Sequence, residues 1–469
     1  MVIQFAFRGA RRAARALGHV AVAIAVLGLS GCGRAPGDAA LDGGSNGADA
    51  CAIAQAARTG TQGADREIRR WQDLVARGTN GVAYLERLGW AYVAAARAGG
   101  DDGDYLLAAA AADCIDQRVP GAPQAMLLRG HALHQMHRFA EAEAVARRLV
   151  AVRGRWFDRG LLGDVLMERG DIAAAAIEYQ AMMDERPGPQ AYARAAHLRW
   201  LGGDLAGAIE AMRLAVRSTH ARDPDAAWGY VRLAGYERQA GHDAAAAALV
   251  EAALRMQPRH PAALHERGRQ ALSAGSIDAA IPDLQAAADL RPLPEYQWAL
   301  VEALHVAGRA AQAAPIERRL AERGAVEDPR TYALYLATRG GDAEMAVRLA
   351  RAELAARADA ATVDALAWSL HAAGRAGEAW DFARRVMATG TRDPRLCLHN
   401  AVIASTAGAG DIARTWLTHA QARRHMLLPS ERSLLDNALA RAARLAAGRG
   451  TRADFPSDSG SGRSRSTTL

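Results

Sequence analysis

The chain has 469 residues, of which half are hydrophobic but only 5% are aromatic. Val, Ile and Thr are too sparse for a large β-sheet, and one compact core is implausible at this length. The formal net charge is +7, all 58 basic residues are arginines, and these alternate with Asp and Glu. This pattern is typical of a solvated, salt-bridged surface and argues against the one-sided basic patch of a nucleic-acid-binding protein.

The N-terminus has the pattern of an export signal. Four arginines and no acidic residue precede residues 20–29, an apolar stretch that is short for a membrane span. The stretch ends in Leu29-Ser30-Gly31-Cys32, which resembles the bacterial lipobox. The resemblance implies that residues 1–31 are a lipoprotein signal peptide and that Cys32 carries a diacylglyceryl group. Removal of the four arginines leaves a net charge of +3, and more than one acyl chain gives stable anchoring.

The residue after Cys32 indicates the destination. Gly33 stands where an aspartate would favour the inner membrane, by resemblance to enterobacterial sorting. We therefore expect an outer-membrane lipoprotein that faces the periplasm, with inner-membrane anchoring as the alternative. A plain secretory signal with an unrelated cysteine is a second alternative. The flanks of Arg11-Arg12 fit a twin-arginine signal poorly.

Residues 32–60 are rich in Gly, Ala and Asp and are expected to form a flexible tether. Residues 61–80 are expected to contain an N-terminal capping helix, because Ile68, Trp71, Leu74 and Val75 fall on one helical side. An oxidising periplasm allows a disulfide between Cys51 and Cys114, and two unpaired cysteines are the equal alternative. Cys397 lies within an expected helix and fits a buried apolar position.

The main part of the chain carries a repeat. Nine alanines recur at nearly regular intervals: Ala142, Ala175, Ala208, Ala246, Ala280, Ala313, Ala346, Ala379 and Ala413. A glycine stands at the same offset before eight of them, at Gly170, Gly203, Gly241, Gly275, Gly308, Gly341, Gly374 and Gly408, and His137 fills this position before Ala142. The period is about 34 residues, which indicates stacked helix–turn–helix units.

When the repeats are aligned on their shared alanine as position 20, nine units begin at residues 123, 156, 189, 227, 261, 294, 327, 360 and 394, and a further unit begins at residue 82. The unit from Trp156 contains Leu162, Gly163, Leu166, Ala175, Tyr179 and Pro187 at the matching positions, and so resembles the tetratricopeptide repeat (TPR) family. The resemblance implies an all-α, right-handed α-solenoid of about ten repeats over residues 82–428. Small residues at positions 8 and 20 allow close helix crossings, glycine at 15 allows the turn, and proline near 32 ends the second helix.

Two segments follow the repeats. Residues 429–447 carry an apolar pattern that predicts a C-terminal capping helix, which such arrays need to cover their last apolar face. Residues 448–469 are of low complexity and are expected to be a disordered tail.

The sequence contains neither HExxH nor, without any lysine, the phosphate-binding GxxxxGK. No CxxC pair indicates a redox motif or a zinc site. We therefore expect a protein that is not an enzyme and has no cofactor.

Family positions 2, 5, 9, 12 and 13 of the first helix of each unit imply an inner-face set that is rich in Trp and His. Its members are Trp90, His131, His134, Asp164, His197, Trp200, Trp228, His265, Arg269, Trp298, His305, Tyr335, Trp368 and His371. Amphipathic aromatic residues in a groove suit the anchoring of a peptide. The alternative is that these wide rings fill gaps between alanine-rich helices.

The spacing His131-x-x-His134 puts two imidazoles on one helical face and could chelate a transition metal, with His137 one turn further on. No third ligand or second shell is evident nearby, so solvated histidines are favoured and no metal is assigned.

The sequence favours a lipid-anchored periplasmic scaffold that binds a protein or an extended peptide in its concave groove, possible roles including envelope assembly. Its expected partners are an unidentified periplasmic or membrane protein and the membrane itself, with no nucleic acid. Two alternatives stay open: an accessory or sensor protein for a metal or small ligand, and the recruiting arm of an envelope enzyme.

Overall fold

The computed structural model describes residues 49–60, 63–78, 81–99, 103–220, 223 and 226–450. The expected signal peptide, Cys32, most of the tether and residues 451–469 lie outside these ranges. The described residues form 23 α-helices, one short 3₁₀ helix and no strand. None of the described helices combines the length and apolar character that crossing a membrane requires.

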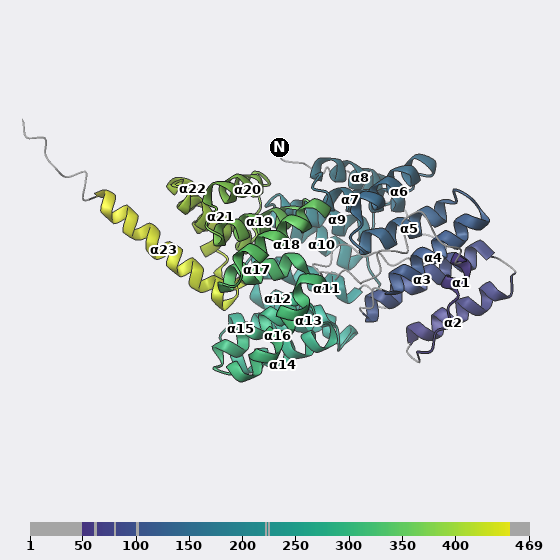
Figure 1. Ribbon diagram of the computed structural model, residues 1–469, viewed down its shortest axis with the longest axis horizontal. Helices are drawn as coiled ribbons and strands as arrows, with labels where there is room; N and C mark the ends of the chain where they lie inside the picture. The colour runs from purple at the N-terminus through teal and green to yellow at the C-terminus, as the bar shows by residue number, and fades with distance from the viewer. Residues whose placement is uncertain are drawn as a thin grey trace, which may run out of the picture.

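Ten consecutive helix pairs make up most of the molecule, and Figure 1 shows them following one another along a coiled path. We call the pairs units 1 to 10, and the two helices of each unit its A and B helices. The units are α3 (Gly81–Gly99) with α4 (Gly103–Arg118), α5 (Pro123–Gln135) with α6 (Phe139–Val152), α7 (Trp156–Glu168) with α8 (Ile172–Glu185), α9 (Pro189–Leu201) with α10 (Leu205–Arg217), α11 (Ala226–Gln239) with α12 (Asp243–Met256), α13 (Pro261–Ser273) with α14 (Ile277–Leu290), α15 (Pro294–Val306) with α16 (Ala310–Glu327), α17 (Pro329–Arg339) with α18 (Ala343–Ala356), α19 (Ala360–Ala372) with α20 (Ala376–Ala388), and α21 (Pro394–Thr406) with α22 (Gly410–Gln421).

Local sequence explains where these helices begin. Proline opens six of the A helices, where its missing N–H and fixed φ are tolerated. Several helices also have an aspartate N-cap: the Asp171 carboxylate accepts a hydrogen bond from the backbone N–H of Ala174, and Asp204 does the same for Gly207. Seven of the ten expected unit starts coincide with the first residue of an A helix, and the others differ by one or two residues.

The turn between the A and B helices explains the glycine repeat. Eight of these turns contain a glycine with φ between +70° and +83°, a left-handed conformation that costs other residues energy. In unit 8 the left-handed residue is Gly340, with φ +73°, so the expected Gly341 is wrong by one position. In unit 2 the position belongs to His137, whose φ is +58°.

Small residues bring the helices together as expected. All nine repeated alanines are buried. At position 8, a Cβ on Gly163 would overlap the ring of Tyr179, and a Cβ on Gly268 would lie 2.7 Å from the Leu284 side chain. Position 8 therefore lets the A helix lie against the large position-24 side chain of its own B helix.

The N-terminal segment is attached to unit 1. Helix α1 (Ala50–Ala54) packs on α4, and a disulfide joins Cys51 to Cys114. The Tyr92 hydroxyl donates to the Ala54 carbonyl at 2.8 Å, and the Arg58 guanidinium pairs with Asp104 at 2.5 Å. The expected tether thus ends in a docked helix, and α2 (Gly63–Ala76) packs next to α3.

At the other end, the 3₁₀ helix η1 (Arg424–Met426) leads into α23 (Pro429–Gly450). Leu435 is buried against the apolar cluster of unit 10, which also contains Cys397. Figure 1 shows the C-terminal half of α23, in yellow, extending away from the repeats. Helix α23 spans the segment expected to cap the array and continues past residue 447 to Gly450.

Candidate functional site: the inner face of the superhelix

The inner face is formed by the A helices, and it is more enclosed than the sequence suggested. In α7, α15, α19 and α21 most residues are buried, on both sides of the helix, although the B helices keep an exposed side. An A helix can be buried all round only if something covers the side that faces away from its B helix. In this molecule, distant parts of the same chain supply that cover.

The coil closes on itself between turns that lie six units apart. The turn after α7 meets the segment before α19, where the Ala358 N–H donates to the Glu168 carbonyl at 2.9 Å. The turn after α9 meets the segment before α21, where a Cβ on Gly390 would lie 3.2 Å from the Gly202 carbonyl oxygen. We call this line of contacts the seam.

The seam continues along α11, α13 and α15. The Gln239 amide donates to the Arg392 carbonyl at 2.9 Å, and the Ser273 hydroxyl donates to the His425 carbonyl at 2.7 Å. The Ser430 hydroxyl donates to the buried Glu302 carboxylate at 2.7 Å. The segment around η1 and the start of α23 therefore lie against the inner face of units 5 to 7.

At the open N-terminal end, aromatic residues connect successive A helices. The Trp90 ring lies 5.3 Å from the ring of His131, and His131 Nε2 lies 2.9 Å from an Arg97 guanidinium nitrogen. Burial, and then the charge of Arg97, hold the pKa of His131 well below its usual value. His131 is therefore neutral at pH 7 and takes part in the protein's own packing.

Three further histidines of units 2 and 4 belong to the enclosed inner face. Burial lowers the pKa of His134 to about 4 and the pKa values of His137 and His197 to about 3. The positive charge of Arg357 adds to the effect at His134 and His137. At neutral pH these side chains are uncharged imidazoles that can donate or accept one hydrogen bond from each nitrogen.

A charged junction lies at the seam. The Arg357 guanidinium is 3.5 Å from Glu168 and 2.8 Å from Glu353, and Arg330 lies 3.4 Å from Asp359. Nearby arginines hold the pKa of Asp359 below its usual value in spite of burial, whereas burial raises the pKa of Glu168. The junction ties unit 3 to units 8 and 9 by charge and hydrogen bonding.

The tryptophans in the middle and C-terminal units have partners within the chain. The Trp200 indole N–H donates to Gln239 at 2.8 Å, and the Trp298 indole N–H donates to Glu302 at 3.0 Å. The Arg395 guanidinium lies 4.9 Å from the Trp298 ring centroid. Trp298 is only 1% exposed, so it is a core residue in this conformation.

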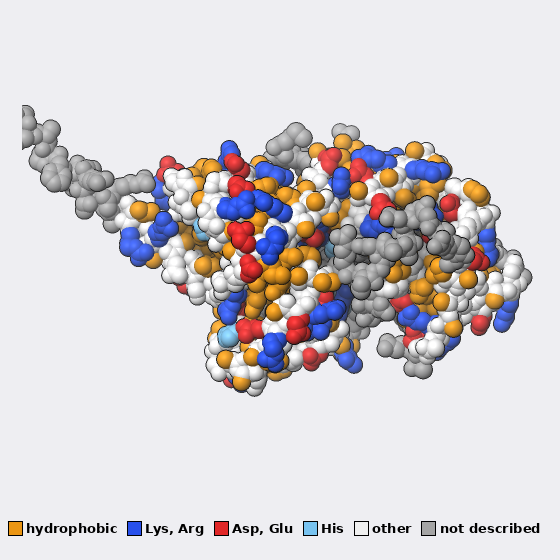
Figure 2. Space-filling view, viewed as in Figure 1, with side chains coloured by type: hydrophobic (Ala, Val, Ile, Leu, Met, Phe, Trp, Pro, Cys, Tyr) orange, Lys and Arg blue, Asp and Glu red, His pale blue; other side chains and the backbone are white. Residues whose placement is uncertain are grey.

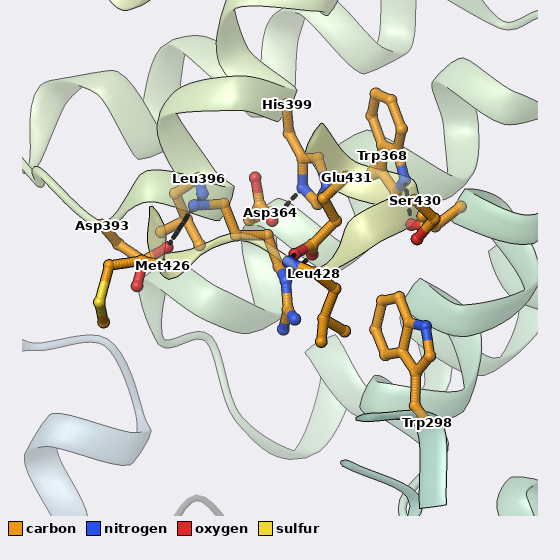
Figure 3. A network of polar contacts seen from close by, with 12 residues as sticks. Trp298, Asp364, Trp368, Asp393, Leu396, His399, Met426, Leu428, Ser430 and Glu431 are labelled. Carbon is orange, nitrogen blue, oxygen red and sulfur yellow. Dashed lines mark hydrogen bonds and ion pairs between the residues drawn. The ribbon is translucent and has the colours of Figure 1, made fainter. Parts of the chain in front are cut away.

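Figure 3 shows the corresponding arrangement in units 9 and 10. His399 Nδ1 lies 2.7 Å from Asp364 Oδ2, and both side chains are fully buried. The His399 ring stacks on Trp368 at 4.2 Å with an interplanar angle of 6°, and the Trp368 indole N–H donates to Thr338 at 3.0 Å. Three successive A helices, α17, α19 and α21, are thus held together by polar and aromatic contacts.

The remaining members of the expected set fall into three groups. His265 is buried and lies 4.5 Å from the Tyr296 ring, and the Arg269 guanidinium donates to the Met426 carbonyl. Asp164 is buried in an ion pair with Arg194 at 2.5 Å. Side chains that keep partial exposure are those of Trp228, His305, Tyr335 and His371.

The structure therefore corrects the expected groove. The selected residues do lie on the A helices, but Trp200, His265, Arg269, Trp298 and Trp368 contact neighbouring A helices or the seam and do not line one open channel. The physical reason is that alanine-rich A helices leave space between them, and wide rings fill it. This is the alternative that the sequence left open.

Several residues of the closed inner face were not selected from the sequence. Glu302 and Asp364 occupy positions 9 and 5 of their units, so the same positional rule includes them, but they are carboxylates. Asn400 is fully buried and neither of its side-chain polar atoms has a hydrogen-bond partner. The seam residues around Ala358, Gly390 and His425 lie outside the paired A and B helices, where the repeat pattern gives no signal.

The alternative of a metal site gains no support from the described part of the chain. His131 is engaged with Arg97, and His305 Nε2 lies 2.9 Å from Glu317. Among the residues that the structure describes, no three His, Cys, Asp or Glu side chains come together in a way that could hold a metal ion. A cavity of about 10 Å³ beside His131, Asp164 and Arg194 has room for roughly one water molecule.

Comparison with known proteins gives similarity in fold alone. Neither a family model nor a curated protein matches the chain. A structure of the APC/C hetero-tetramer Cut9–Hcn1 is 16% identical, with a TM-score of 0.41 over 83% of this chain and 62% of that chain. Yeast Tom70 is 14% identical (TM-score 0.33; 83% and 94% covered), and Pseudomonas aeruginosa PilF is 14% identical (TM-score 0.37; 42% and 90% covered).

The class of protein follows from the repeat geometry of the chain itself. Ten helix–turn–helix units of regular length, left-handed turn glycines and buried position-20 alanines form a TPR-type α-solenoid. The chain spans 62% of the length of the Cut9–Hcn1 chain that it matches. The activity and partners of those proteins are not assigned to this one.

Proposed function

We propose that this protein is a lipid-anchored scaffold of the bacterial cell envelope that faces the periplasm from the outer membrane. The observation that carries the proposal is the disulfide between Cys51 and Cys114, because structural disulfides persist in oxidising compartments. Cys51 follows the lipobox-like Cys32 closely in sequence, so one short segment carries both the expected anchor and the bridge.

The proposed activity is the binding of another protein by the superhelix. A solenoid of ten units offers an extended surface in place of a single deep pocket. Trp228 and Tyr335 are half-buried on the A helices and can still contact a partner. Figure 2 shows basic and acidic side chains intermingled on the face in view, which suits a protein partner better than a nucleic acid.

Localisation tests the first part of the proposal. The full chain is expressed in a Gram-negative host beside Cys32→Ser, and the membranes are separated on a density gradient. We expect the wild-type protein in the outer-membrane fraction with a diacylglyceryl mass on Cys32. Cys32→Ser should not carry this mass. Wild-type protein that lacks the lipid would contradict the proposed anchor.

Partner capture tests the second part. The lipidated protein is crosslinked in intact cells, and the adducts are compared with those of Trp228→Ala on an A helix and Trp380→Ala on the B helix α20. Both tryptophans are half-buried, so the two variants lose similar side chains. We expect an adduct with the wild type and Trp380→Ala that is lost with Trp228→Ala. An adduct that survives Trp228→Ala would argue against the inner face.

A further inference from the structure

At units 3 and 4 the seam differs chemically from the rest of the fold. Within each unit, and between neighbouring units, helices meet through buried apolar side chains. Among the described residues, the apolar clusters of units 2 to 4 include nothing after Leu249, although the turns of units 3 and 4 touch the segments before α19 and α21. At these two points, contact across the seam depends on backbone approach, one ion pair and single hydrogen bonds.

The energetic consequence follows from these contact types. A typical intramolecular hydrogen bond makes only a small net contribution to stability, because water replaces it when it breaks. Burial of one large apolar side chain contributes more than such a hydrogen bond, and each unit buries several. Separation of the seam at units 3 and 4 therefore costs far less than separation of adjacent units, and belongs to the low-energy local openings of a native protein.

We infer that the superhelix opens along this seam while its units stay folded, so that the seam gates access to the inner face. Opening separates the Ala358 N–H from the Glu168 carbonyl and Gly203 from Gly390. The residues exposed first lie beside these contacts and include the Trp200–Gln239–Arg392 chain of hydrogen bonds. The role of the opened face in partner binding depends on the function proposed above, whereas the opening itself does not.

Two pairs of glycines supply a matched test. Gly170 and Gly203 both have φ +82°; a Cβ on Gly170 would lie 2.6 Å from the Ala358 carbonyl oxygen, and a Cβ on Gly203 would overlap the Gly390 carbonyl. Gly241 and Gly275 occupy the same turn position, with φ +83° and +79°, and have no atom within 4 Å of such a Cβ. Alanine at either pair introduces the same backbone strain, but only the first pair introduces a clash across the seam.

The experiment compares Gly170→Ala/Gly203→Ala with Gly241→Ala/Gly275→Ala in the full chain without any partner. The measurements are helix content by circular dichroism, radius of gyration by small-angle scattering, and hydrogen exchange of the Ala358 amide. We expect equal helix content in both variants, a larger radius in the first variant alone, and Ala358 exchange at least tenfold faster in the first variant than in the second. Equal radii and equal exchange in the two variants would overturn the inference.

A second variant covers the case in which Gly170→Ala/Gly203→Ala loses helix content. Ser273→Ala removes the hydrogen bond to the His425 carbonyl and introduces no clash. If the seam opens as one continuous line, Ser273→Ala should raise the exchange rate of the Ala358 amide. An unchanged exchange rate would contradict opening along the whole line. Because no partner is present, failure to open is distinguishable from failure to bind.

Discussion

At the scale of single residues, the turn between A and B helices shows how a strained position can persist in a repeat. His137 has φ +58° where eight other units have a left-handed glycine. Its ring stacks on Phe139 at 5.3 Å and is half-buried, so side-chain packing offsets part of the backbone cost. A left-handed conformation costs an ordinary residue about 1–2 kcal/mol.

The first prediction separates these two contributions. His137→Gly and His137→Ala both remove the ring, but only glycine relieves the backbone strain. We expect His137→Gly to be more stable than His137→Ala by about 1 kcal/mol in denaturant unfolding. The same comparison at exposed Arg309, which has an ordinary φ of −97°, should show no advantage of glycine. Equal stability of the two His137 variants would mean that the turn changes its backbone conformation and does not hold alanine at a positive φ.

The buried histidines lead to a second prediction, on pH. Burial lowers the pKa of His197 to about 3 in the folded chain, whereas an unfolded histidine titrates near 6.5. Between these values the unfolded state binds the extra proton, so stability is complete above about pH 6.5 and falls as the pH decreases. His197→Gln should remove up to about 1.4 kcal/mol per pH unit from this slope below pH 6.

Urea unfolding at pH 7, 6 and 5 measures this slope. His220→Gln is the control, because His220 is exposed, and it should leave the slope unchanged. A slope that is the same in His197→Gln and in the wild type would show that His197 is protonated in the folded chain.

At the scale of elements, the N-terminal helix depends on its disulfide. The Cys51–Cys114 bridge spans 63 residues. In the chain-entropy model, a bridge that closes a loop of this size stabilises the folded state by about 4 kcal/mol. Helix α1 has only five residues, so we expect it to leave α4 when the bridge is removed.

Limited proteolysis of Cys51→Ala/Cys114→Ala tests this expectation. Cleavage should appear around residues 49–60 while units 3 to 10 stay protected, because each unit packs mainly on its neighbours. Cys397→Ala, which alters a buried free cysteine, should not produce this cleavage. Protection of α1 in the double variant would show that the Tyr92 and Arg58 contacts are sufficient.

A fourth prediction concerns the start of α23. Glu431 is buried and accepts hydrogen bonds from the Arg395 guanidinium and the Leu428 N–H, and the arginine holds its pKa below the usual value. Glu431→Gln leaves the half-buried Arg395 guanidinium without the carboxylate that it contacts, a loss that costs at most about 3–5 kcal/mol. We expect a lower melting temperature for Glu431→Gln. The exposed pair of Arg384 and Asp381 gives the control, and Asp381→Asn should change the melting temperature little.

At the scale of the whole molecule, the repeat could be predicted from sequence because it is local. Alanine and glycine at fixed offsets determine each helix crossing and each turn, and α5, α7, α9, α13, α15, α19 and α21 begin at the expected residues. The shift in unit 8 could not be foreseen: α16 extends to Glu327, Asp328 caps α17, and the turn moves to Gly340.

The closed inner face was beyond prediction for a different reason. Glu168 meets Ala358 only after the small rotation at each of several unit interfaces has accumulated, and a repeat pattern does not fix these angles. The same Trp and His residues can therefore line an open groove in one superhelix and fill the interior of another. The positional rule assigns Trp298 and Trp368 to one side of their helices, but it could not show what lies opposite that side.

The contact of Gly203 with Gly390 has a consequence for how this gene can change. Open solenoids tolerate duplication or loss of a unit, because each unit needs only its two neighbours. Here the partners across the coil are separated by a fixed number of units. Duplication of any one unit between them would shift every later contact by a whole repeat and bring unrelated side chains opposite each other. Copy number in this stretch should therefore be constrained, while units could be added outside it with less disturbance.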